Sequence, residues 1–527
     1  MAKILIIYPS SSPDIPGGEV DWERYKSIPN GPLAIATFLH HKGHDVKIID
    51  ARPLPKETTL KLVEDSLSGT DLVCVGANTV QLKHGIILSD HIKRINRDVP
   101  ILFGGIHAIM YPSQTVADKS IDYVVHGEAE YTILELIEYL EKKDKRLEDI
   151  KGLAFKQNGK IIITPAAPGI DPNELPLPDY SLLEDVEKYI NREFSTNLGK
   201  IRKMRGLDIH TSRGCPYRCT FCPMTMPEFR GYRNLRLEKV FELIDIAVQK
   251  YNVGHIWFSD ELFFSNKLKV KRIARHIIDK GYKITWESNA RVEQFRESLL
   301  DDETLRVMKE SGCYALRMGM ESGSNRVLNL MKKDSCVDNT IHAVRQCEKY
   351  GIIPVGNFIC GFPTETKEEV LDTAKLILTL KEISPNGLFF SPGLLRPYPG
   401  TEMYELCKRY GGYEEPQTLR EWANRKIDVG LFANPTDLKW VKYPTWLRNF
   451  QVYFYIITVL KTHEKTGTKL SPTWKFFAKL AVKRLYSNFW GVAFEPPLLI
   501  HVKNFLDKKS KIAEFLKSTL RLDLSQI

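Results

Sequence analysis

The sequence has none of the features that mark a secreted or membrane-spanning chain. No run in its 527 residues approaches the ~18 to 20 apolar residues that cross a bilayer. The opening MAKILIIYPS lacks the charged leader and the small-residue cleavage site of a signal peptide. Six of the nine cysteines are scattered singly, so disulfides are not expected. We therefore expect a cytoplasmic protein.

A dinucleotide fingerprint is also missing. No Gly-x-Gly-x-x-Gly opens the first expected helix, which argues against a nicotinamide cofactor. Short β-branched runs instead alternate with amphipathic segments, which predicts a doubly wound, Rossmann-like α/β domain over residues 1–150. Glycines fall where strands are expected to end, at Gly76, Gly104, Gly105 and Gly127. We therefore expect a ligand at that edge of the sheet.

The alternation resumes after a linker. Residues 151–205 contain a hairpin pattern with Asn158-Gly159 as its turn, followed by the proline-rich DPNELPLPDY. From 206 to 400, six strand and helix units follow in series. They predict a partial (β/α)6 barrel of the TIM type, with its chemistry at the carboxyl ends of the strands. Residues 401–527 are expected to form a mostly helical C-terminal domain.

Three cysteines stand together in CPYRCTFC, where Cys215, Cys219 and Cys222 follow an expected strand. A structural zinc site needs a fourth ligand, and only His210 is close in sequence. A cubane iron–sulfur cluster accepts three thiolates and leaves one iron free to chelate a small molecule. Three interpretations stay open, namely such a cluster, zinc, or cysteines without metal. The spacing and the loop favour the first.

The motif resembles the signature of radical S-adenosylmethionine enzymes. FSDELF, GMESGSNRVLNLMKK and GNFICGFPTET match later segments of that family in order. The resemblance implies a [4Fe–4S] cluster on the three cysteines and S-adenosylmethionine on the open iron. An external donor of the flavodoxin or ferredoxin type would supply the electron that yields a 5′-deoxyadenosyl radical. The implied S-adenosylmethionine contacts are Phe221, Asp260, Glu261, Glu321, Ser322, Gly323, Gly356, Gly361, Pro363 and Glu365.

The order of a doubly wound domain, a linker and a cysteine loop resembles the cobalamin-binding subgroup of this family. The Asp-x-His-x-x-Gly element by which many cobalamin proteins bind cobalt is absent. The lower cobalt face would then meet the loop 78–81, while His107 would touch the corrin edge or tail, or be a loop histidine bonded to backbone. Glu128 could instead cap a helix. The implied cobalamin contacts are Asn78, Thr79, Val80, Gln81, Gly104, Gly105, His107, Gly127 and Glu128.

The two resemblances together imply a cobalamin-dependent methyltransferase that acts on an unactivated carbon. One S-adenosylmethionine would methylate the corrinoid, and a second would give the radical that abstracts hydrogen. The same scaffold fits a non-methylating enzyme, either an oxidative cyclase or a lipid carbon–carbon bond former, and more remotely a sensor without turnover. Arg291 and Arg317, at or beside expected barrel strands, are either paired ions or ligands of cofactor or substrate.

Positive charge is concentrated near the end of the sequence. Residues 441–527 hold fifteen Lys or Arg against five Asp or Glu, which accounts for the whole net charge of +10. Dense Trp, Tyr and Phe accompany them, as in a helical cap over the barrel, a peripheral membrane contact, or a site for an acidic partner. No nucleic-acid recognition module is visible. This composition favours a substrate that is large, lipid-like or anionic.

Overall fold

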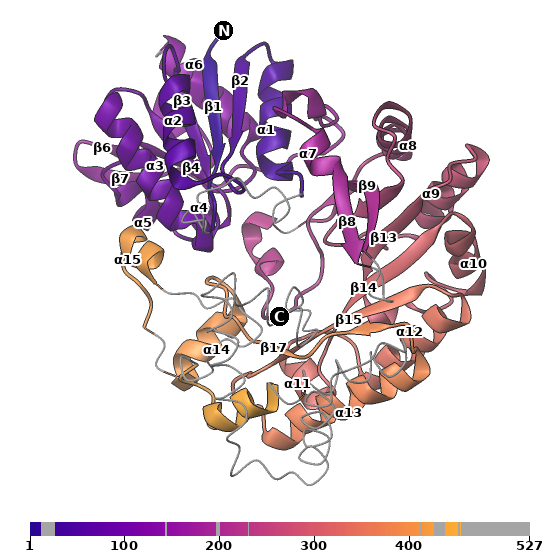
Figure 1. The fold of residues 1–527 in the computed structure, drawn as a ribbon. Helices are drawn as coiled ribbons and strands as arrows, with labels where there is room; N and C mark the ends of the chain where they lie inside the picture. The colour runs from indigo at the N-terminus through magenta and orange to yellow at the C-terminus, as the bar shows by residue number, and fades with distance from the viewer. Residues whose placement is uncertain are drawn as a thin grey trace, which may run out of the picture.

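The computed structural model describes residues 1–11, 27–142, 145–195, 201–229, 231–411, 414–425, 438–451 and 454. Two large sheets with helices packed against them dominate these residues (Figure 1). No helix in these ranges is both long and apolar enough to cross a bilayer. Most of the basic, aromatic-rich stretch 441–527 lies outside them, so its helical cap and its membrane contact stay predictions.

The first sheet has the strand order β2-β1-β3-β4-β5-β6-β7. Strands β1 to β5 are parallel, as the continuous apolar runs predict, while β6 and β7 are antiparallel additions. The order reverses between β1 and β3, and ligands of open α/β sheets bind at such a switch point. The strands are β1 (Lys3–Tyr8), β2 (Asp45–Asp50), β3 (Leu72–Gly76), β4 (Ile101–Gly104), β5 (Tyr123–Val125), β6 (Leu153–Gln157) and β7 (Lys160–Ile163).

The hairpin expected in the linker is present and belongs to the first sheet. Asn158 and Gly159 both have positive φ, 50° and 75°, which is the requirement of a type I′ turn. Strand β6 pairs with β5, so the hairpin extends the sheet past its last parallel strand. The pairing could not be read from the sequence, because an isolated hairpin pattern does not specify its neighbour.

Helices cover both faces of the first sheet, and each face has its own apolar core. Alternate strand residues supply the two cores, with Ile4 and Ile6 on one face and Leu5 and Ile7 on the other. The helices are α1 (Asn30–His41), α2 (Lys56–Ser66), α3 (Leu82–Ile95), α4 (Ile106–Met110), α5 (Pro112–Ala117) and α6 (Glu130–Lys142). The core beneath α1 and α6 is continuous with that of the second sheet.

The second sheet is the expected partial barrel. Its order is β16-β15-β14-β13-β12-β9-β8, with β17 also paired to β15. The six predicted strands are parallel, and β8 adds an antiparallel edge that the sequence analysis missed. The strands are β8 (Asn191–Ser195), β9 (Ile201–Ile209), β12 (His255–Phe258), β13 (Thr285–Ala290), β14 (Cys313–Glu321), β15 (Ile353–Cys360), β16 (Leu388–Phe389) and β17 (Gly393–Leu394).

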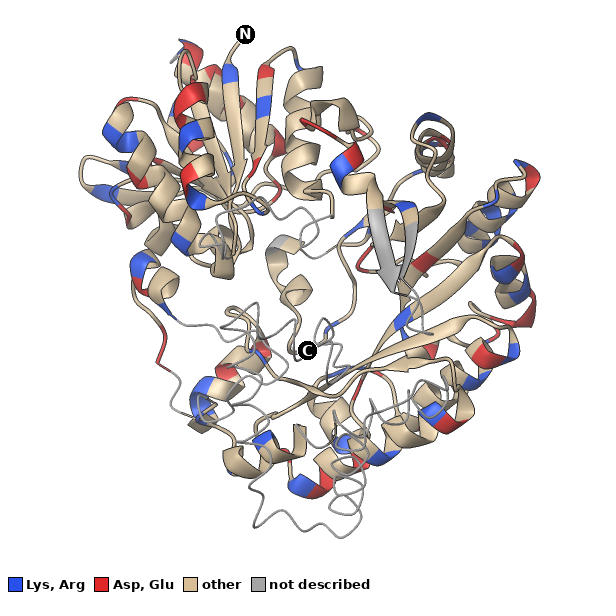
Figure 2. Cartoon of the chain, viewed as in Figure 1, with Lys and Arg blue, Asp and Glu red and all other residues tan. Residues whose placement is uncertain are grey.

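Helices pack on one side of this sheet, away from the first sheet (Figure 1). They are α8 (Leu237–Asp245), α9 (Lys267–Asp279), α10 (Asp302–Glu310), α11 (Asn325–Leu330), α12 (Val337–Lys349) and α13 (Lys367–Ile383). Ile256, Phe258 and Trp286 point into the core that these helices share. Successive strand residues alternate, so Trp257 and Glu287 lie on the other side, called here the inner face. Figure 2 shows most charged residues on helices and few on the barrel strands.

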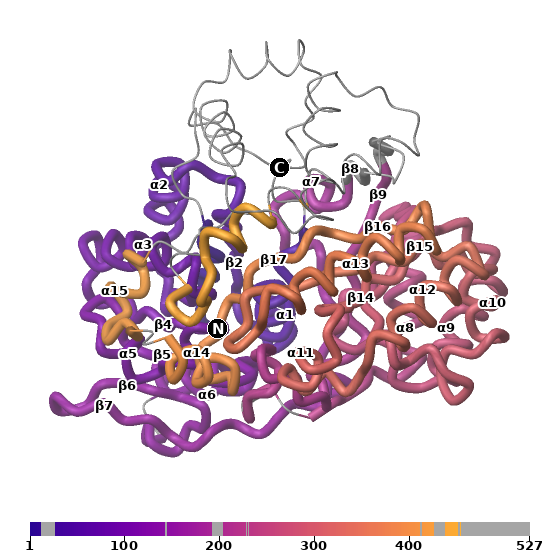
Figure 3. The backbone as a smooth tube through the Cα atoms, turned by 90° about the horizontal axis from the view of Figure 1, so that it is seen from below, coloured from indigo at the N-terminus to yellow at the C-terminus, as the bar shows by residue number. Residues whose placement is uncertain are grey.

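The described C-terminal elements bridge the two sheets. Helix α14 (Glu402–Gly411) packs on the barrel through Met403 and Cys407. Helix α15 (Leu419–Asn424) instead lies beside α3 and α5 of the first sheet, as Figure 3 shows from below. Its Leu419 and Trp422 are buried in the core of that sheet. The predicted C-terminal region thus begins by joining the two cores.

Candidate active site

The start of the cysteine loop is held by a buried acid. Thr211 N donates to Asp260 Oδ1 at 2.8 Å, the Ser212 hydroxyl donates to the same carboxylate, and Lys269 Nζ donates to Thr211 Oγ1 at 2.9 Å. Asp260 is fully buried. Its carboxylate therefore shapes the loop, and its contact with S-adenosylmethionine stays a prediction.

The three cysteines lie close to one another in a partly buried loop. Burial raises the pKa of Cys222 to about 11 and raises that of Cys215 as well, and each thiol lies within electrostatic reach of the other two. Within the described ranges, no three His, Cys, Asp or Glu side chains converge closely enough to hold a single metal ion. Zinc would need such convergence, whereas a cubane binds each thiolate on a separate iron. The geometry therefore favours the cluster.

Glu261 follows Asp260 and differs from it. Its side chain is accessible although protein surrounds it on most sides, and this desolvation raises its pKa. It lies within electrostatic reach of Cys215 and Arg213. Of these two acids, both predicted to contact S-adenosylmethionine, Glu261 is exposed whereas Asp260 is buried.

A buried ion pair lies at the end of β14, beside the third cysteine. Lys333 Nζ is 2.9 Å from Glu321 Oε1, and both side chains are 7% exposed. Glu321 has a φ of 62°, and Lys333 lies 5.9 Å from the ring centroid of Phe221. Lys333 also lowers the pKa of Cys222, against the larger effect of burial. Lys333 was not among the residues predicted from the sequence, although it is the last lysine of GMESGSNRVLNLMKK.

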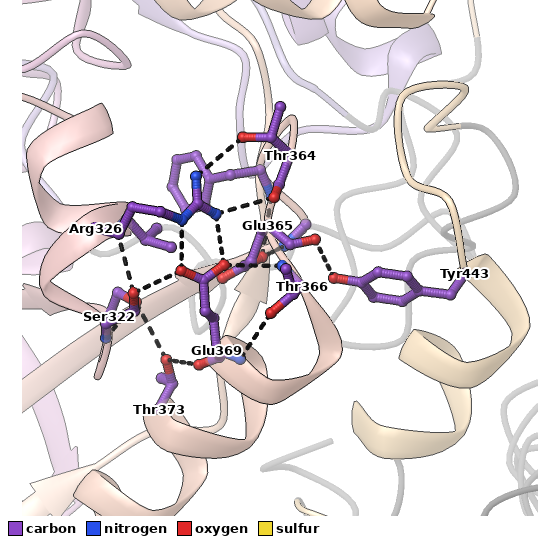
Figure 4. Close-up of polar contacts among 12 residues, drawn as sticks. Ser322, Arg326, Thr364, Glu365, Thr366, Glu369, Thr373 and Tyr443 are labelled. Atoms are coloured by element: carbon purple, nitrogen blue, oxygen red, sulfur yellow. Dashed lines mark hydrogen bonds and ion pairs between the residues drawn. The ribbon is translucent and has the colours of Figure 1, made fainter.

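The next two predicted residues make contacts within the fold. A Cβ on Gly323 would lie 2.4 Å from Asp372 O, so glycine permits a close approach of the β14 end to α13. Ser322 Oγ lies 3.3 Å from Thr373 Oγ1 of the same helix, and Figure 4 shows both side chains in one network. Both residues therefore fix the end of β14 on α13.

The turn after β15 is held by a second buried acid. Glu365 Oε2 accepts from Gly361 N at 2.6 Å and from Phe362 N at 3.2 Å. Burial raises the pKa of Glu365 to about 8, while the hydrogen bonds from Gly361 N and Phe362 N act in the opposite direction. The Tyr443 hydroxyl donates to Glu365 O, and Trp440 Nε1 donates to Gly361 O at 2.8 Å. Residues from the C-terminal region thus cover this turn, which the sequence could not indicate.

An ion pair closes the same turn from outside. Arg326 binds Glu369 through two hydrogen bonds and donates to Thr364 O at 2.9 Å (Figure 4). Thr364 has a φ of 68°, which is costly for a β-branched residue unless its surroundings fix it. Pro363 lies in this turn. Gly356 is a packing glycine, since its Cβ would meet Met320 Sδ at 2.6 Å.

The edge of the first sheet beyond β3 contains the loop predicted for cobalt. Gln81 links it to β1, because its Oε1 accepts from Asn78 N at 2.9 Å and its Nε2 donates to Pro9 O at 2.6 Å. Residues Thr79–Gln81 form one 3-10 turn, in which Val80 is 37% exposed. The loop therefore presents an apolar side chain at the switch point of the sheet.

The end of β4 completes this edge. Gly105 has a φ of 94°, and a Cβ there would lie 2.6 Å from Ala77 O, so only glycine allows the β3 and β4 ends to approach. A Cβ on Gly104 or Gly127 would meet no atom within 4 Å. Those two glycines border open space, as a backbone that contacts a ligand must.

His107 is fully buried beside this edge. Its Nδ1 lies 3.1 Å from Thr79 Oγ1, and its ring contacts Tyr111 and Trp422. Burial lowers the pKa of His107 to about 4, so the ring is neutral at pH 7. Two buried atoms here, His107 Nε2 and Asn78 Oδ1, have no hydrogen-bond partner among the residues described.

Glu128 lies between the two sheets, and protein groups donate hydrogen bonds to both of its carboxylate oxygens. Arg233 donates to both of its oxygens at 2.8 and 2.9 Å, and Ile170 N donates to Oε2 at 2.6 Å. Arg213, two residues before the first cysteine, binds the neighbouring Glu130 at 2.6 Å. Asn30 of α1 also contacts His210 at 3.2 Å. Glu128, which was predicted to contact cobalamin, thus joins the first sheet to the residues around the cysteine loop.

The comparisons with known proteins agree with this geometry. The model of the Radical SAM superfamily matches residues 209–377, and that of the B12 binding domain matches residues 24–137. An uncharacterized methyltransferase of Pyrococcus horikoshii is 32% identical over 414 residues, which are 77% of this chain and 83% of that protein. The chain belongs to the cobalamin-binding radical S-adenosylmethionine family. Its cofactors are a [4Fe–4S] cluster, S-adenosylmethionine and cobalamin.

Two further members of this family show its range. An anaerobic magnesium-protoporphyrin IX monomethyl ester cyclase of Rubrivivax gelatinosus is 27% identical over 57% of this chain and 52% of that protein. The solved structure of the cobalamin-dependent radical enzyme OxsB with aqua-cobalamin has a TM-score of 0.66 and 18% identity, over 92% of this chain and 70% of that one. This second likeness shows the shared fold.

The residues present fit the cofactors of the family. Three thiols spaced for a cluster, with Glu261 and the Glu321–Lys333 pair beside them, suit a cluster that carries a charged amino acid. At the other edge, the orphaned atoms of Asn78 and His107, the exposed Val80 and the open Gly104 suit a large ring with amide side chains.

Proposed function

We propose that this enzyme transfers a methyl group from cobalamin to an unactivated carbon of an organic substrate. The observation that carries the proposal is the direct contact between the two cofactor sites. Arg233 and Arg213, on either side of the cysteine loop, bind Glu128 and Glu130 at the edge of the first sheet. Both cofactors can therefore address one substrate. A relative that is 32% identical is named a methyltransferase, which agrees.

When bound, the cluster with S-adenosylmethionine supplies a 5′-deoxyadenosyl radical, and the corrinoid supplies the methyl group. The protein positions the parts. Cys215, Cys219 and Cys222 hold the cluster, and Glu261 and Lys333 lie where they can bind the amino and carboxylate groups of S-adenosylmethionine. Val80 and its loop would pack against the bound corrinoid. Fixed geometry of this kind removes the entropic cost of bringing three molecules together.

The inner face of the barrel is where we place the substrate. Arg317 lies on this face, because β14 pairs it with Asn289, which follows Glu287 by two residues. Its Nη2 donates to Glu287 Oε1 at 3.1 Å, and its guanidinium lies 5.4 Å from the ring centroid of Trp257. The side chain is 38% exposed, so part of it is open to a ligand.

Two donors on this face lack acceptors. Arg317 Nε and Trp257 Nε1 are buried, and neither has a hydrogen-bond partner in the part of the chain that the structure describes. Leaving such donors unpaired costs about 1 to 3 kcal/mol each, so a substrate oxygen would be bound well here. The proposal therefore extends to a substrate with a carboxylate or carbonyl group at this position, which includes an anionic substrate.

Label transfer tests the proposal. The full-length enzyme is reconstituted anaerobically with iron, sulfide and cobalamin, and is incubated with a low-potential reductant, methyl-labelled S-adenosylmethionine and a small-molecule extract of its source cells. A methyltransferase should place the label in one product and form S-adenosylhomocysteine and 5′-deoxyadenosine in equal amounts. 5′-Deoxyadenosine without labelled product would refute methyl transfer and favour a cyclase.

A further inference from the structure

Arg291, at the end of β13, makes a direct contact with a predicted cluster ligand. Its Nη1 donates to Cys219 Sγ at 3.3 Å, and its guanidinium lies 3.6 Å above the ring centroid of Tyr217 in the same loop. Its Nη2 donates to Lys333 O, and its Nε pairs with Glu293. Arg291 is 9% exposed. Three other protein groups therefore fix this cation against the sulfur of Cys219.

The backbone around Arg291 is fixed as well. Arg291 N donates to Gln294 Oε1 at 2.8 Å, and Gln294 Nε2 donates to Phe264 O at 2.7 Å. Gln294 is itself buried. The backbone of Arg291 is thus held by a side chain that a neighbouring loop fixes, so the position of Arg291 does not depend on the cysteine loop alone.

We infer that Arg291 is a positioning residue that sets the reduction potential of the cluster. Hydrogen bonds to cluster sulfurs and the local charge are the main protein controls on that potential. Reduction adds one negative charge, and a buried cation that donates to a ligand sulfur stabilises the reduced form. Water screens a buried charge only weakly. Arg291 therefore makes the cluster easier to reduce by an external donor.

Glu293 should act in the opposite sense. Its carboxylate pairs with Arg291, and its Oε2 is buried without a hydrogen-bond partner in the described residues. A second negative charge near the cluster disfavours the added electron. Removing the charge of Glu293 should therefore raise the potential, whereas removing that of Arg291 should lower it. A purely structural role predicts no such pair of opposite shifts.

A matched control lies on the same loop. Arg296 is exposed, and it is five residues from Arg291. Replacing either arginine with methionine changes the net charge by the same amount, and only Arg291 touches a cysteine. A shift caused by overall charge would appear in both variants, whereas a shift caused by the contact would appear in R291M alone.

The test is a potentiometric titration of the reconstituted full-length enzyme without substrate, followed by the electron paramagnetic resonance signal of the reduced cluster. R291M should lower the midpoint potential enough to change the ratio of reduced to oxidised cluster about tenfold, which is about 59 mV for one electron. E293Q should raise the midpoint, and R296M should leave it unchanged. Iron and sulfide content is measured on every sample.

Three results would overturn the inference. They are an unchanged midpoint in R291M with full iron content, equal shifts in R291M and R296M, or a lowered midpoint in E293Q. If R291M fails to hold the cluster, R291K and E293Q decide the matter, because lysine keeps the charge but loses the forked geometry. The titration needs neither substrate nor cobalamin, so its failure is distinct from failure of the methyl-transfer proposal.

Discussion

The two cofactor sites are held by different kinds of interaction. Charged groups surround the cysteine loop, namely Asp260 at its start, Arg291 on Cys219 and the Glu321–Lys333 pair beside Cys222. Neutral groups hold the loop 78–81 and His107 at the edge of the first sheet. The difference follows the ligands, because a cluster with S-adenosylmethionine carries formal charge that needs fixed counter-charges, whereas a corrin ring mainly needs shape and amide partners.

Replacing Cys219 with alanine should have the largest effect and should be confined to one site. Loss of a thiolate removes the cluster, so 5′-deoxyadenosine formation should fall below detection. Cobalamin binding should persist, because the first sheet has its own apolar core. Iron analysis and the corrinoid absorption spectrum measure the two outcomes separately. C336A is the control, since Cys336 lies outside the loop, and 5′-deoxyadenosine from C219A would contradict the assignment.

The variant R233M tests the contact between the two cofactor sites. R233M removes the double hydrogen bond to Glu128 and leaves that partly buried carboxylate without its main cation. Both cofactors should still bind, but their relative position should loosen, and methyl transfer should fall about 100-fold. R146M is the matched control, since Arg146 forms an exposed pair with Asp149 that is worth little. Equal losses in both variants would count against a specific role of this boundary.

The fold class of both sheets followed from the sequence, since alternating runs and glycines at strand ends reflect burial and backbone constraints. The contacts that individual side chains make could not be predicted in this way. Asp260 holds Thr211, and Arg420 binds Asp90 and Asp118 more than 300 residues away, and the sequence predicted neither contact. Such contacts depend on how segments pack in space, and local residue patterns carry no record of them.

A substitution at Gly105 tests the cobalamin site predicted at the edge of the first sheet, called here the neutral site. G105A places a Cβ 2.6 Å from Ala77 O at a positive φ, which should destabilise the first sheet by about 2 kcal/mol and weaken cobalamin binding. G104A has open space for the same methyl group and should leave the free energy of unfolding nearly unchanged. Denaturant unfolding measures the free energy of unfolding of each variant, and titration with cobalamin measures its affinity for the cofactor. Similar destabilisation by G104A would show that the close approach to Ala77 is not the cause.

His107 should make the neutral site sensitive to acid. Its folded-state pKa is about 4, below its ordinary value of 6.5, so the unfolded chain binds the proton more readily. The stability contributed by neutral His107 is present above pH 6.5 and is lost as pH falls toward 4, about 2 kcal/mol by pH 5. H107Q should remove this part of the pH dependence of unfolding. An identical acid slope in H107Q would mean that other groups produce it.

The smallest effect is expected from two tryptophan variants that compare the inner face of the barrel with its outer face. W257F keeps the ring beside Arg317 and removes the unpaired Nε1–H, so the KM for substrate should rise about fivefold, equivalent to about 1 kcal/mol. W286F makes the same change on the outer face, where Nε1 donates to Ser311 Oγ at 3.0 Å. It should lower stability and leave KM unchanged, because that face packs on helices. Cobalamin binding should be unaffected by either variant, because both residues belong to the barrel. A rise in KM with W286F but not with W257F would show that the substrate does not bind on the inner face.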